Sequence, residues 1–193
     1  LFQLPAIYLG KEYKLPTIVL SPLKALIVDQ VESLQDLGYT RVAYASSDLS
    51  PEQKMEVYRQ VCEGEIDLFY LSPELLLSYD IKHFIGERRI GLVVVDEAHT
   101  VTTWGKEFRV DYWFLGRYLN ILKQTLGYNF PLFALTATAV WNPGGGNDMI
   151  FETICSLQME PCVLYVGTVK RQNIGFDIRQ MEVEDGETYD KAK

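Results

Sequence analysis

The sequence predicts an α/β fold with a mostly parallel sheet and helices on both faces. Short apolar runs rich in β-branched residues alternate with longer segments that carry apolar residues at helical spacing. Several of these runs are followed at once by a helix start signal or by polar residues. With 48% hydrophobic and 23% charged residues in 193 positions, the composition is that of a globular protein with one core.

The first elements set this alternation. Leu1–Gly10 has the pattern of an amphipathic helix, and Thr17–Leu20 that of a buried strand. Ser21 and Pro22 then predict a helix, with Ser as N-cap and Pro at the first helical position, which ends at Gly38. The apolar stripe of this helix consists of Leu23, Leu26, Ile27, Val31, Leu34 and Leu37.

A second strand–helix pair follows. Val42–Ala45 predicts a short strand. Ser50 and Gln53 have the spacing of a capping box, and the predicted helix runs to about Glu63, where Gly64 ends it.

The middle of the chain continues the alternation. Ile66–Leu71 predicts a strand, and Ser72–Tyr79 a short helix that begins with another Ser-Pro pair. Ile90–Val95 and Pro131–Leu135 predict two further strands, separated by a helix over Asp111–Leu126.

The last part of the chain is less regular. Gly144–Gly146 predicts a flexible loop, since no Lys-Ser or Lys-Thr follows it as in a phosphate-binding loop. Asn147 predicts the cap of a helix that ends near Leu157, followed by a strand over Val163–Val166 and an extended segment over Asn173–Arg179.

Composition excludes some classes of function. The net charge of −8 repels polyanions, so any nucleic-acid contact needs a local basic or aromatic patch. Cys62, Cys155 and Cys162 have no metal-binding spacing and predict buried thiols in a reducing, intracellular setting. No apolar run is long enough to span a bilayer. Because the chain opens without Met inside a predicted helix, we expect a piece excised from a longer protein.

Polar residues follow four of the predicted strands. They are Ser21, Ser72, the pair Asp96 and Glu97, and the segment Thr136–Thr138. Ligand sites of parallel sheets lie at the carboxyl ends of the strands, so these residues predict one site at that edge. Taken singly, the serines are typical helix caps and the threonines typical ends of a strand.

Asp96 and Glu97 are the strongest candidates for chemistry. Burial of a carboxylate is unfavourable unless it is paired or binds a metal. Two carboxylates at a strand end suit a magnesium nucleotide site, in which one orients the hydrated metal and the other polarises water, although acidic pairs also cap helices. The segment Asp96–His99 (DEAH) resembles the Walker B box of superfamily-two helicases and translocases.

The segment Trp104–Arg109 (WGKEFR) resembles the aromatic-rich loop of RecQ-family DNA helicases, whose usual form is W-G-H-D-F-R. Lys106 and Glu107 depart from that form. Trp104, Phe108 and Arg109 can stack on bases and bind phosphate, although aromatic residues on such a loop also commonly pack on a sheet.

Further segments resemble the same family in the same order along nearly the whole chain. They are Leu1–Leu9, Ser21–Gln30, Leu71–Glu74, Leu135–Ala139 and Arg171–Ile174.

The resemblance implies an N-terminally truncated RecA-like P-loop NTPase domain. Residues 1–170 would be part of the first motor domain without its phosphate-binding loop, and residues 171–193 would lead toward a second RecA-like domain. The implied cofactors are ATP and Mg²⁺, with zinc not expected here. The implied partner is single-stranded DNA or a junction of duplex and single strand. The implied location is the bacterial nucleoid or cytoplasm, or the eukaryotic nucleus.

The resemblance also implies roles. Asp96 would hold Mg²⁺ through water, Glu97 would be the catalytic base, and His99, Thr136 and Thr138 would couple hydrolysis to movement. Contacts to nucleic acid would come from Ser21, Lys24, Ser72, Trp104, Phe108 and Arg109.

Two alternatives remain open. One is an RNA helicase or duplex translocase built on the same motor. The other is a helicase-like domain without enzymatic activity that binds DNA or docks a protein. Because the phosphate-binding loop is absent from these residues, we expect the isolated fragment neither to hydrolyse ATP nor to unwind DNA.

Overall fold

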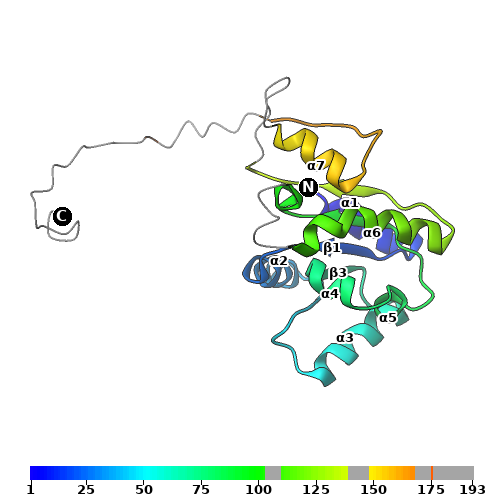
Figure 1. Ribbon diagram of the computed structural model, residues 1–193. Coiled ribbons are helices and arrows are strands. Elements are labelled where there is room, and N and C mark those ends of the chain that lie inside the picture. The colour runs from blue at the N-terminus through cyan, green and yellow to red at the C-terminus, as the bar shows by residue number, and fades with distance from the viewer. Residues whose placement is uncertain (103–109, 139–147, 168–174, 176–193) are drawn as a thin grey trace, which may run out of the picture.

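The computed structural model describes residues 1–102, 110–138, 148–167 and 175, with the backbone alone at 110–113. The strands lie side by side in the middle of the molecule and helices flank them (Figure 1). The predicted loop residues 104–109, the Gly-rich segment 144–146 and the segment 171–174 fall outside this description.

The sheet has five parallel strands in the order β2-β3-β1-β4-β5. The parallel α/β prediction is therefore confirmed. The strands are β1 (Thr17–Leu20), β2 (Val42–Ala45), β3 (Leu68–Leu71), β4 (Leu92–Val95) and β5 (Leu132–Ala134).

Helices cover both faces of this sheet. One face carries α1 (Gln3–Tyr13) and α2 (Lys24–Asp36), and Val19, Tyr70 and Val94 point into the core between them. The helices over the other face pack on alternate residues such as Ile18 and Val93. They are α3 (Pro51–Glu63), α4 (Pro73–Ser78), α5 (Lys82–Ile85), α6 (Val110–Leu126), α7 (Met149–Leu157) and the 3-10 helix η1 (Ala98–Val101).

Local signals located several elements correctly. β1 and β2 have the predicted bounds. Ser50 and Gln53 form both hydrogen bonds of the capping box, and Gly64 ends α3 in the left-handed conformation. Ser72 caps α4 by accepting a hydrogen bond from the backbone N–H of Leu75 at 3.3 Å. The short helices α5 and η1, of four residues each, were not predicted from the sequence.

Ser21 does not cap a helix, so that prediction is wrong. Its backbone N–H continues the sheet by donating to Leu71 O at 3.2 Å, and α2 begins only at Lys24. The Ser21 hydroxyl is buried without a hydrogen-bond partner. Continuation of the strand pairing carries the chain past the predicted helix start.

The strand predicted over Val163–Val166 is also wrong, since this segment is irregular and its Val163 and Tyr165 side chains are 79% and 89% exposed. A strand needs a hydrogen-bonded neighbour. Among the described strands, β5 at the edge of the sheet pairs only with β4, and the segment Val163–Val166 does not add to it.

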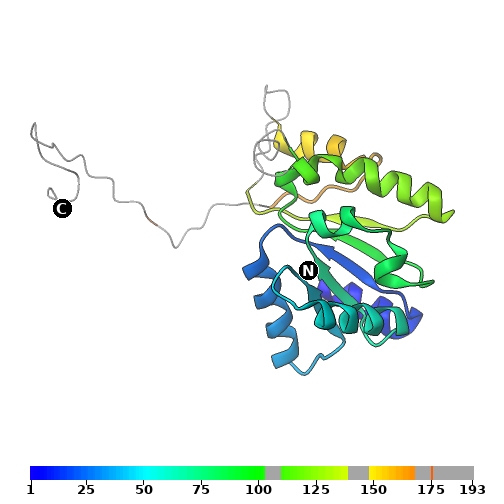
Figure 2. The same ribbon diagram turned by 60° about the horizontal axis from the view of Figure 1, so that its bottom comes forward.

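Small boundary errors arise at the other elements. β3 and β4 begin two residues later than predicted, at Leu68 and Leu92. The N-cap of α7 is Asp148 rather than Asn147, and its carboxylate accepts from the backbone N–H groups of Ile150 and Phe151. α7 lies against α6 in both ribbon views (Figures 1 and 2).

An ion pair between the partly exposed Arg41 and the buried Asp67 stabilises the amino-terminal edge of the sheet. Asp67 is fully buried, and Arg41 binds both of its carboxylate oxygens at 2.7 and 2.9 Å. Tyr39 donates its hydroxyl to the same carboxylate at 3.0 Å, and burial raises the pKa of Tyr39 well above its ordinary value. A Cβ on Gly10 would lie 2.3 Å from Asp67 Cγ, so α1 packs directly on this pair.

The thiol prediction holds only in part. Cys62 is half-buried, whereas Cys155 and Cys162 are exposed, so the prediction that all three thiols are buried was wrong.

The described helices include none that is long and apolar enough to cross a membrane.

Candidate functional site

Asp96 lies at the carboxyl end of β4, the strand between β1 and β5 in the sheet. Its backbone N–H donates to Leu20 O at 2.8 Å, which extends the β1–β4 pairing by one residue. Its Oδ1 accepts from the backbone N–H of Glu97 at 3.0 Å, and its Oδ2 accepts from Gln30 Nε2 at 3.2 Å. The carboxylate is therefore held by one donor on each oxygen.

Glu97 turns the chain out of the sheet. Its backbone has φ 49° and ψ 44°, the left-handed conformation, which costs a residue with a side chain about 1–2 kcal/mol. The next N–H, that of Ala98, donates to Leu135 O at 2.8 Å and anchors the turn beside the end of β5. Glu97 Oε2 is buried and makes no hydrogen bond. A buried carboxylate oxygen without a donor is suited to a water or another ligand.

His99 joins the ends of β4 and β5. Its Nδ1 lies 2.9 Å from Thr136 Oγ1, 3.1 Å from Thr138 Oγ1 and 3.3 Å from Glu97 Oε2. A single ring nitrogen carries at most one proton, so these three oxygens compete for it. Thr136 is the nearest, which agrees with Glu97 Oε2 being left without a hydrogen bond.

Thr136 and Thr138 form a turn directed at this histidine. The backbone N–H of Thr138 donates to Thr136 Oγ1 at 3.3 Å, and both threonine side chains are exposed to solvent. The structure thus brings together two sequence segments, Asp96–His99 and Thr136–Thr138, that were predicted separately. The described geometry links them through His99.

The predicted nucleic-acid contacts lie at the same edge of the sheet, after β1 and β3. Lys24 is half-exposed but forms an ion pair with Asp48, which follows β2. Ser72 is half-buried and occupied as a helix cap, and Ser21 is only 1% exposed. Of the three, Lys24 has the side chain best placed for a phosphate. Trp104, Phe108 and Arg109 lie outside the described residues.

The carboxylates fit a hydrated magnesium ion better than an enclosed metal site. Among the described residues, no group of three or more His, Cys, Asp or Glu side chains lies close enough to hold a metal ion. Mg²⁺ commonly keeps several waters and binds one or two carboxylates together with substrate phosphates. The acceptor oxygens of Asp96, with the free Oε2 of Glu97, match that mode of binding.

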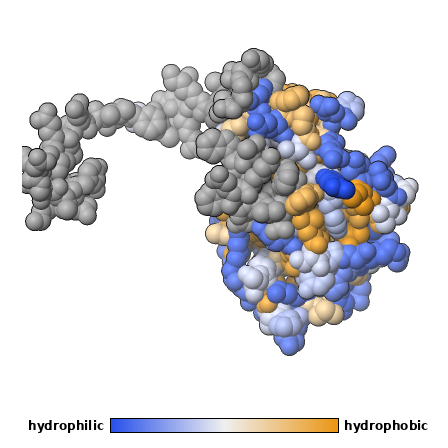
Figure 3. Space-filling view, viewed as in Figure 1, coloured by the Kyte–Doolittle hydropathy of each residue, from blue (hydrophilic) through white to orange (hydrophobic). Residues whose placement is uncertain are grey.

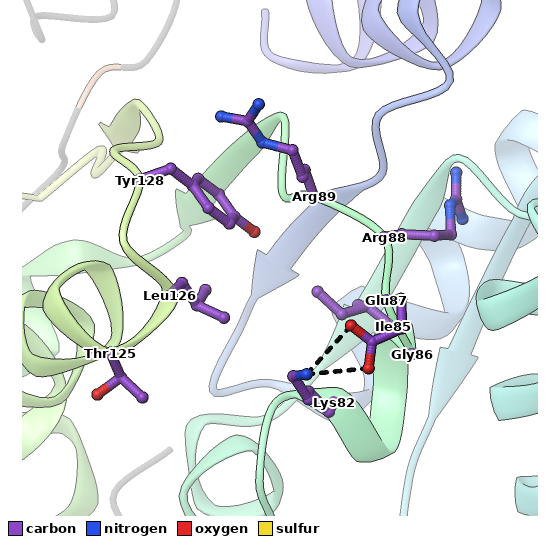
Figure 4. A pocket seen from close by; sticks show the side chains of 9 residues that line it. All are labelled: Lys82, Ile85, Gly86, Glu87, Arg88, Arg89, Thr125, Leu126 and Tyr128. Carbon is purple, nitrogen blue, oxygen red and sulfur yellow. Dashed lines mark hydrogen bonds and ion pairs between the residues drawn. The ribbon is translucent and has the colours of Figure 1, made fainter.

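The cavity in Figure 4 is not part of this site. It has a volume of about 200 Å³ and lies between the turn before β4 and the end of α6, at the opposite edge of the sheet. Charged side chains that line the cavity have partners within it: Lys82 forms an ion pair with Glu87 at 2.9 Å, and Arg89 lies 4.5 Å from the centre of the Tyr128 ring.

One of the apolar surface patches in Figure 3 lies at α7, where Phe151 is exposed.

A comparison with protein families decides the assignment. The family model for the DEAD/DEAH box helicase matches residues 1–143. The chain belongs to the DEAD/DEAH box helicase family. The DEAH residues of this helicase chain, Asp96–His99, are the ones that the structure places at the end of β4.

Relatives of this helicase chain include RecQ proteins. The ATP-dependent DNA helicase RecQ of Bacillus subtilis is 33% identical over 187 residues, which cover 95% of this chain and 29% of that protein. The RecQ of Synechocystis sp. is 39% identical over 143 residues, covering 72% of this chain and 28% of that protein. The helicase chain therefore spans less than a third of either relative.

Solved helicase structures share the fold. The crystal structure of the DUF1998 helicase MrfA bound to DNA aligns with a TM-score of 0.61 at 21% identity, over 83% of this chain and 22% of that chain. At this identity the likeness shows the architecture alone. The predicted α/β helicase fold is confirmed.

Sequence analysis of the helicase chain missed Gln30 and Tyr70. The sequence places Gln30 within the segment Ser21–Gln30 that resembles the helicase family, and Tyr70 within a predicted strand, but it gives neither of them a role at Asp96. Their hydrogen bonds to the site join residues 66 and 40 positions apart, so spacing along the chain carries no signal for them.

Proposed function

We propose that this chain is a large part of the first RecA-like motor domain of a RecQ-type, ATP-dependent DNA helicase. Residues 1–170 would belong to that domain, and residues 171–193 would lead toward a second one. The observation that carries this proposal is the cluster formed by Glu97, His99 and Thr136 beside Asp96, in a chain of this family.

The proposed chemistry is hydrolysis of ATP by an activated water. Bound Mg²⁺ supplies the positive charge that offsets the charge of the phosphates. Asp96 would orient that ion through water with the carboxylate that Glu97 N–H and Gln30 hold in place. Glu97 Oε2, buried and without a donor, would accept the proton of the attacking water.

Coupling would run through His99. Protonation of Glu97 would change the charge on its Oε2, which lies near His99 Nδ1. The histidine would then shift its hydrogen bond between Glu97 and the two threonines. Thr136 and Thr138 would carry that change out of the hydrolysis site. DNA bound by Trp104, Phe108 and Arg109 would act on the same histidine, because these residues follow it closely in the sequence.

The proposed partners are single-stranded DNA, or its junction with duplex, and a second RecA-like domain. DNA repair and recombination are the processes that such a motor would serve. The proposed location is wherever chromosomal DNA is held, the nucleoid of a bacterium or the nucleus of a eukaryote.

The deciding experiment is ATP hydrolysis by the full-length protein that carries this chain, with single-stranded DNA or RNA added. We expect stimulation by single-stranded DNA and little by RNA, together with ATP-dependent unwinding of duplex DNA with a single-stranded tail. Stimulation by RNA alone would favour the RNA helicase, and DNA binding without any hydrolysis would favour the non-enzymatic module. Hydrolysis by the isolated 193-residue chain would contradict the expectation that the fragment is inactive.

A first prediction concerns the DNA-sensing loop. Trp104→Ala is expected to abolish most of the stimulation by DNA while ATP binding is retained, since stacking on one aromatic ring contributes about 1–3 kcal/mol per base. The measurement is the hydrolysis rate with and without DNA, beside binding of a fluorescent ATP analogue. An unchanged stimulated rate would remove this loop from the coupling route.

A second prediction concerns Lys24. Its partner Asp48 is 59% exposed and competes with phosphate for the same ammonium group. Asp48→Asn is expected to tighten single-stranded DNA binding roughly two- to five-fold, the range of an exposed ion pair. Fluorescence anisotropy at several salt concentrations measures the affinity for single-stranded DNA. The control is Asp36→Asn, which removes the same charge from an exposed position on α2, the helix that begins at Lys24. Equal effects of both variants would mean that general charge, rather than Lys24, is responsible.

A further inference from the structure

A chain of hydrogen bonds ends on Asp96. Gln3 Nε2 on α1 donates to the hydroxyl of Tyr70 on β3 at 3.4 Å. That hydroxyl donates to Gln30 Oε1 on α2 at 3.2 Å, and Gln30 Nε2 donates to Asp96 Oδ2 at 3.2 Å. Four elements of the fold therefore meet through side chains at one carboxylate.

The chemistry of these groups fixes the direction of the chain. A carboxylate oxygen only accepts, so the amide NH₂ of Gln30 must face Asp96 and its carbonyl must face Tyr70. Tyr70 must then donate, and its oxygen can still accept from Gln3. Burial raises the pKa of Tyr70 to about 12, so the hydroxyl keeps the proton that it donates.

The surroundings make this arrangement specific. The Tyr70 side chain is fully buried, in register with Val19 of β1, which in turn faces Val94 of β4. A hydroxyl in such an apolar row is unfavourable without a partner. Gln30 lies on the side of α2 that also carries the buried Ile27, and it provides that partner.

We propose, on the basis of the helicase function proposed above, that Gln30 is a positioning residue for Asp96 and that Tyr70 holds Gln30 in place. The Glu97 N–H and the Gln30 NH₂ each donate to one oxygen of the carboxylate, and its remaining lone pairs would be available to hold the waters of a bound Mg²⁺.

The test uses the full-length protein with Gln30→Met, Tyr70→Phe and the double variant. Met has nearly the length of Gln but no donor, and Phe removes only the hydroxyl. Two quantities are measured against free Mg²⁺: the rate of ATP hydrolysis with saturating DNA, and the affinity for a fluorescent ADP without DNA. Single-stranded DNA affinity without nucleotide and the unfolding temperature are measured on the same samples.

For Gln30→Met we expect the Mg²⁺ concentration at half-maximal effect to rise about 10- to 100-fold in both measurements, the usual effect of losing an outer-shell partner of a metal ligand. Tyr70→Phe should produce a smaller rise in the same direction. The double variant should match Gln30→Met alone, because Tyr70 acts only through Gln30. DNA affinity without nucleotide should stay unchanged.

Matched controls are Gln35→Met, an exposed glutamine on α2, and Tyr58→Phe, a buried tyrosine on the other face of the sheet. An unchanged Mg²⁺ requirement in folded Gln30→Met, or equal shifts in the controls, would overturn the positioning role. Additive effects in the double variant would overturn the role of Tyr70, and loss of folding in both single variants would show a structural role instead. A wild-type protein without ATP hydrolysis would refute the helicase function itself.

Discussion

Glu97→Gln is expected to lower ATP hydrolysis by the full-length protein about 10²- to 10⁴-fold, the usual contribution of a general base. Gln has the size of Glu and fits the same left-handed position, but its amide cannot take a proton from water. Binding of single-stranded DNA and of ATP should remain, because neither the Asp96 carboxylate nor Lys24 is altered. The measurement is single-turnover hydrolysis with saturating DNA and Mg²⁺.

The control is Glu32→Gln, which removes the same charge from an exposed position on α2. We also expect the unfolding temperature of Glu97→Gln to be unchanged or higher, since the substitution removes a carboxylate whose buried Oε2 has no donor. Hydrolysis within a factor of a few of the wild-type rate would show that another group is the base.

Arg41→Ala is expected to lower the free energy of unfolding by about 2–3 kcal/mol, because it leaves the Asp67 carboxylate buried without its charged partner. Breaking a fully buried pair costs about 3–5 kcal/mol, and the 39% exposure of Arg41 lets solvent screen part of that loss. Tyr39 would remain as a donor, but a hydroxyl does not neutralise a charge. Chemical denaturation of the 193-residue chain, followed by circular dichroism, measures this loss.

Arg59→Ala is the matched comparison. Arg59 contacts three carboxylates, Glu56, Glu63 and Glu65. Its side chain is 43% exposed, close to the 39% of Arg41, but its partners are more than half exposed, whereas Asp67 is fully buried. Exposed pairs contribute about 0–1 kcal/mol, so this variant should be nearly neutral despite having more ion pairs. Similar losses in the two arginine variants would mean that burial does not govern the effect. The double variant Arg41→Ala/Asp67→Ala should be less destabilised than the sum of its parts.

Two Ser-Pro pairs show how far local sequence predicts this fold. Ser72-Pro73 and Ser21-Pro22 both follow a buried strand, yet only Ser72 caps a helix. The first turn of α4 contains an acidic residue, Glu74, which favours a helix N-terminus, whereas the first turn of α2 contains none. The absence of an acidic residue after Ser21-Pro22 therefore indicates a weaker helix N-terminus there than after Ser72-Pro73.

The location of the candidate site in the fold was predictable from the sequence, but the contacts that hold its side chains were not. Asp96, Glu97 and His99 stand together in the sequence, and their place after an apolar run locates them at the end of a strand. The contact between Gln30 and Asp96 depends on where α2 lies over the sheet, which no local pattern specifies. The strand predicted over Val163–Val166 failed for a related reason, since alternation of side chains does not supply a neighbouring strand.

The backbone conformation at Glu97 is unfavourable for the residue type found there. Folding alone would favour Gly at a position with φ 49°, because Gly adopts that conformation without steric penalty. The side chain that this backbone conformation disfavours is the one that the proposed role as catalytic base requires. In a descendant that had abandoned nucleotide hydrolysis, selection would no longer oppose the more stable residue, and position 97 would be among the first to drift.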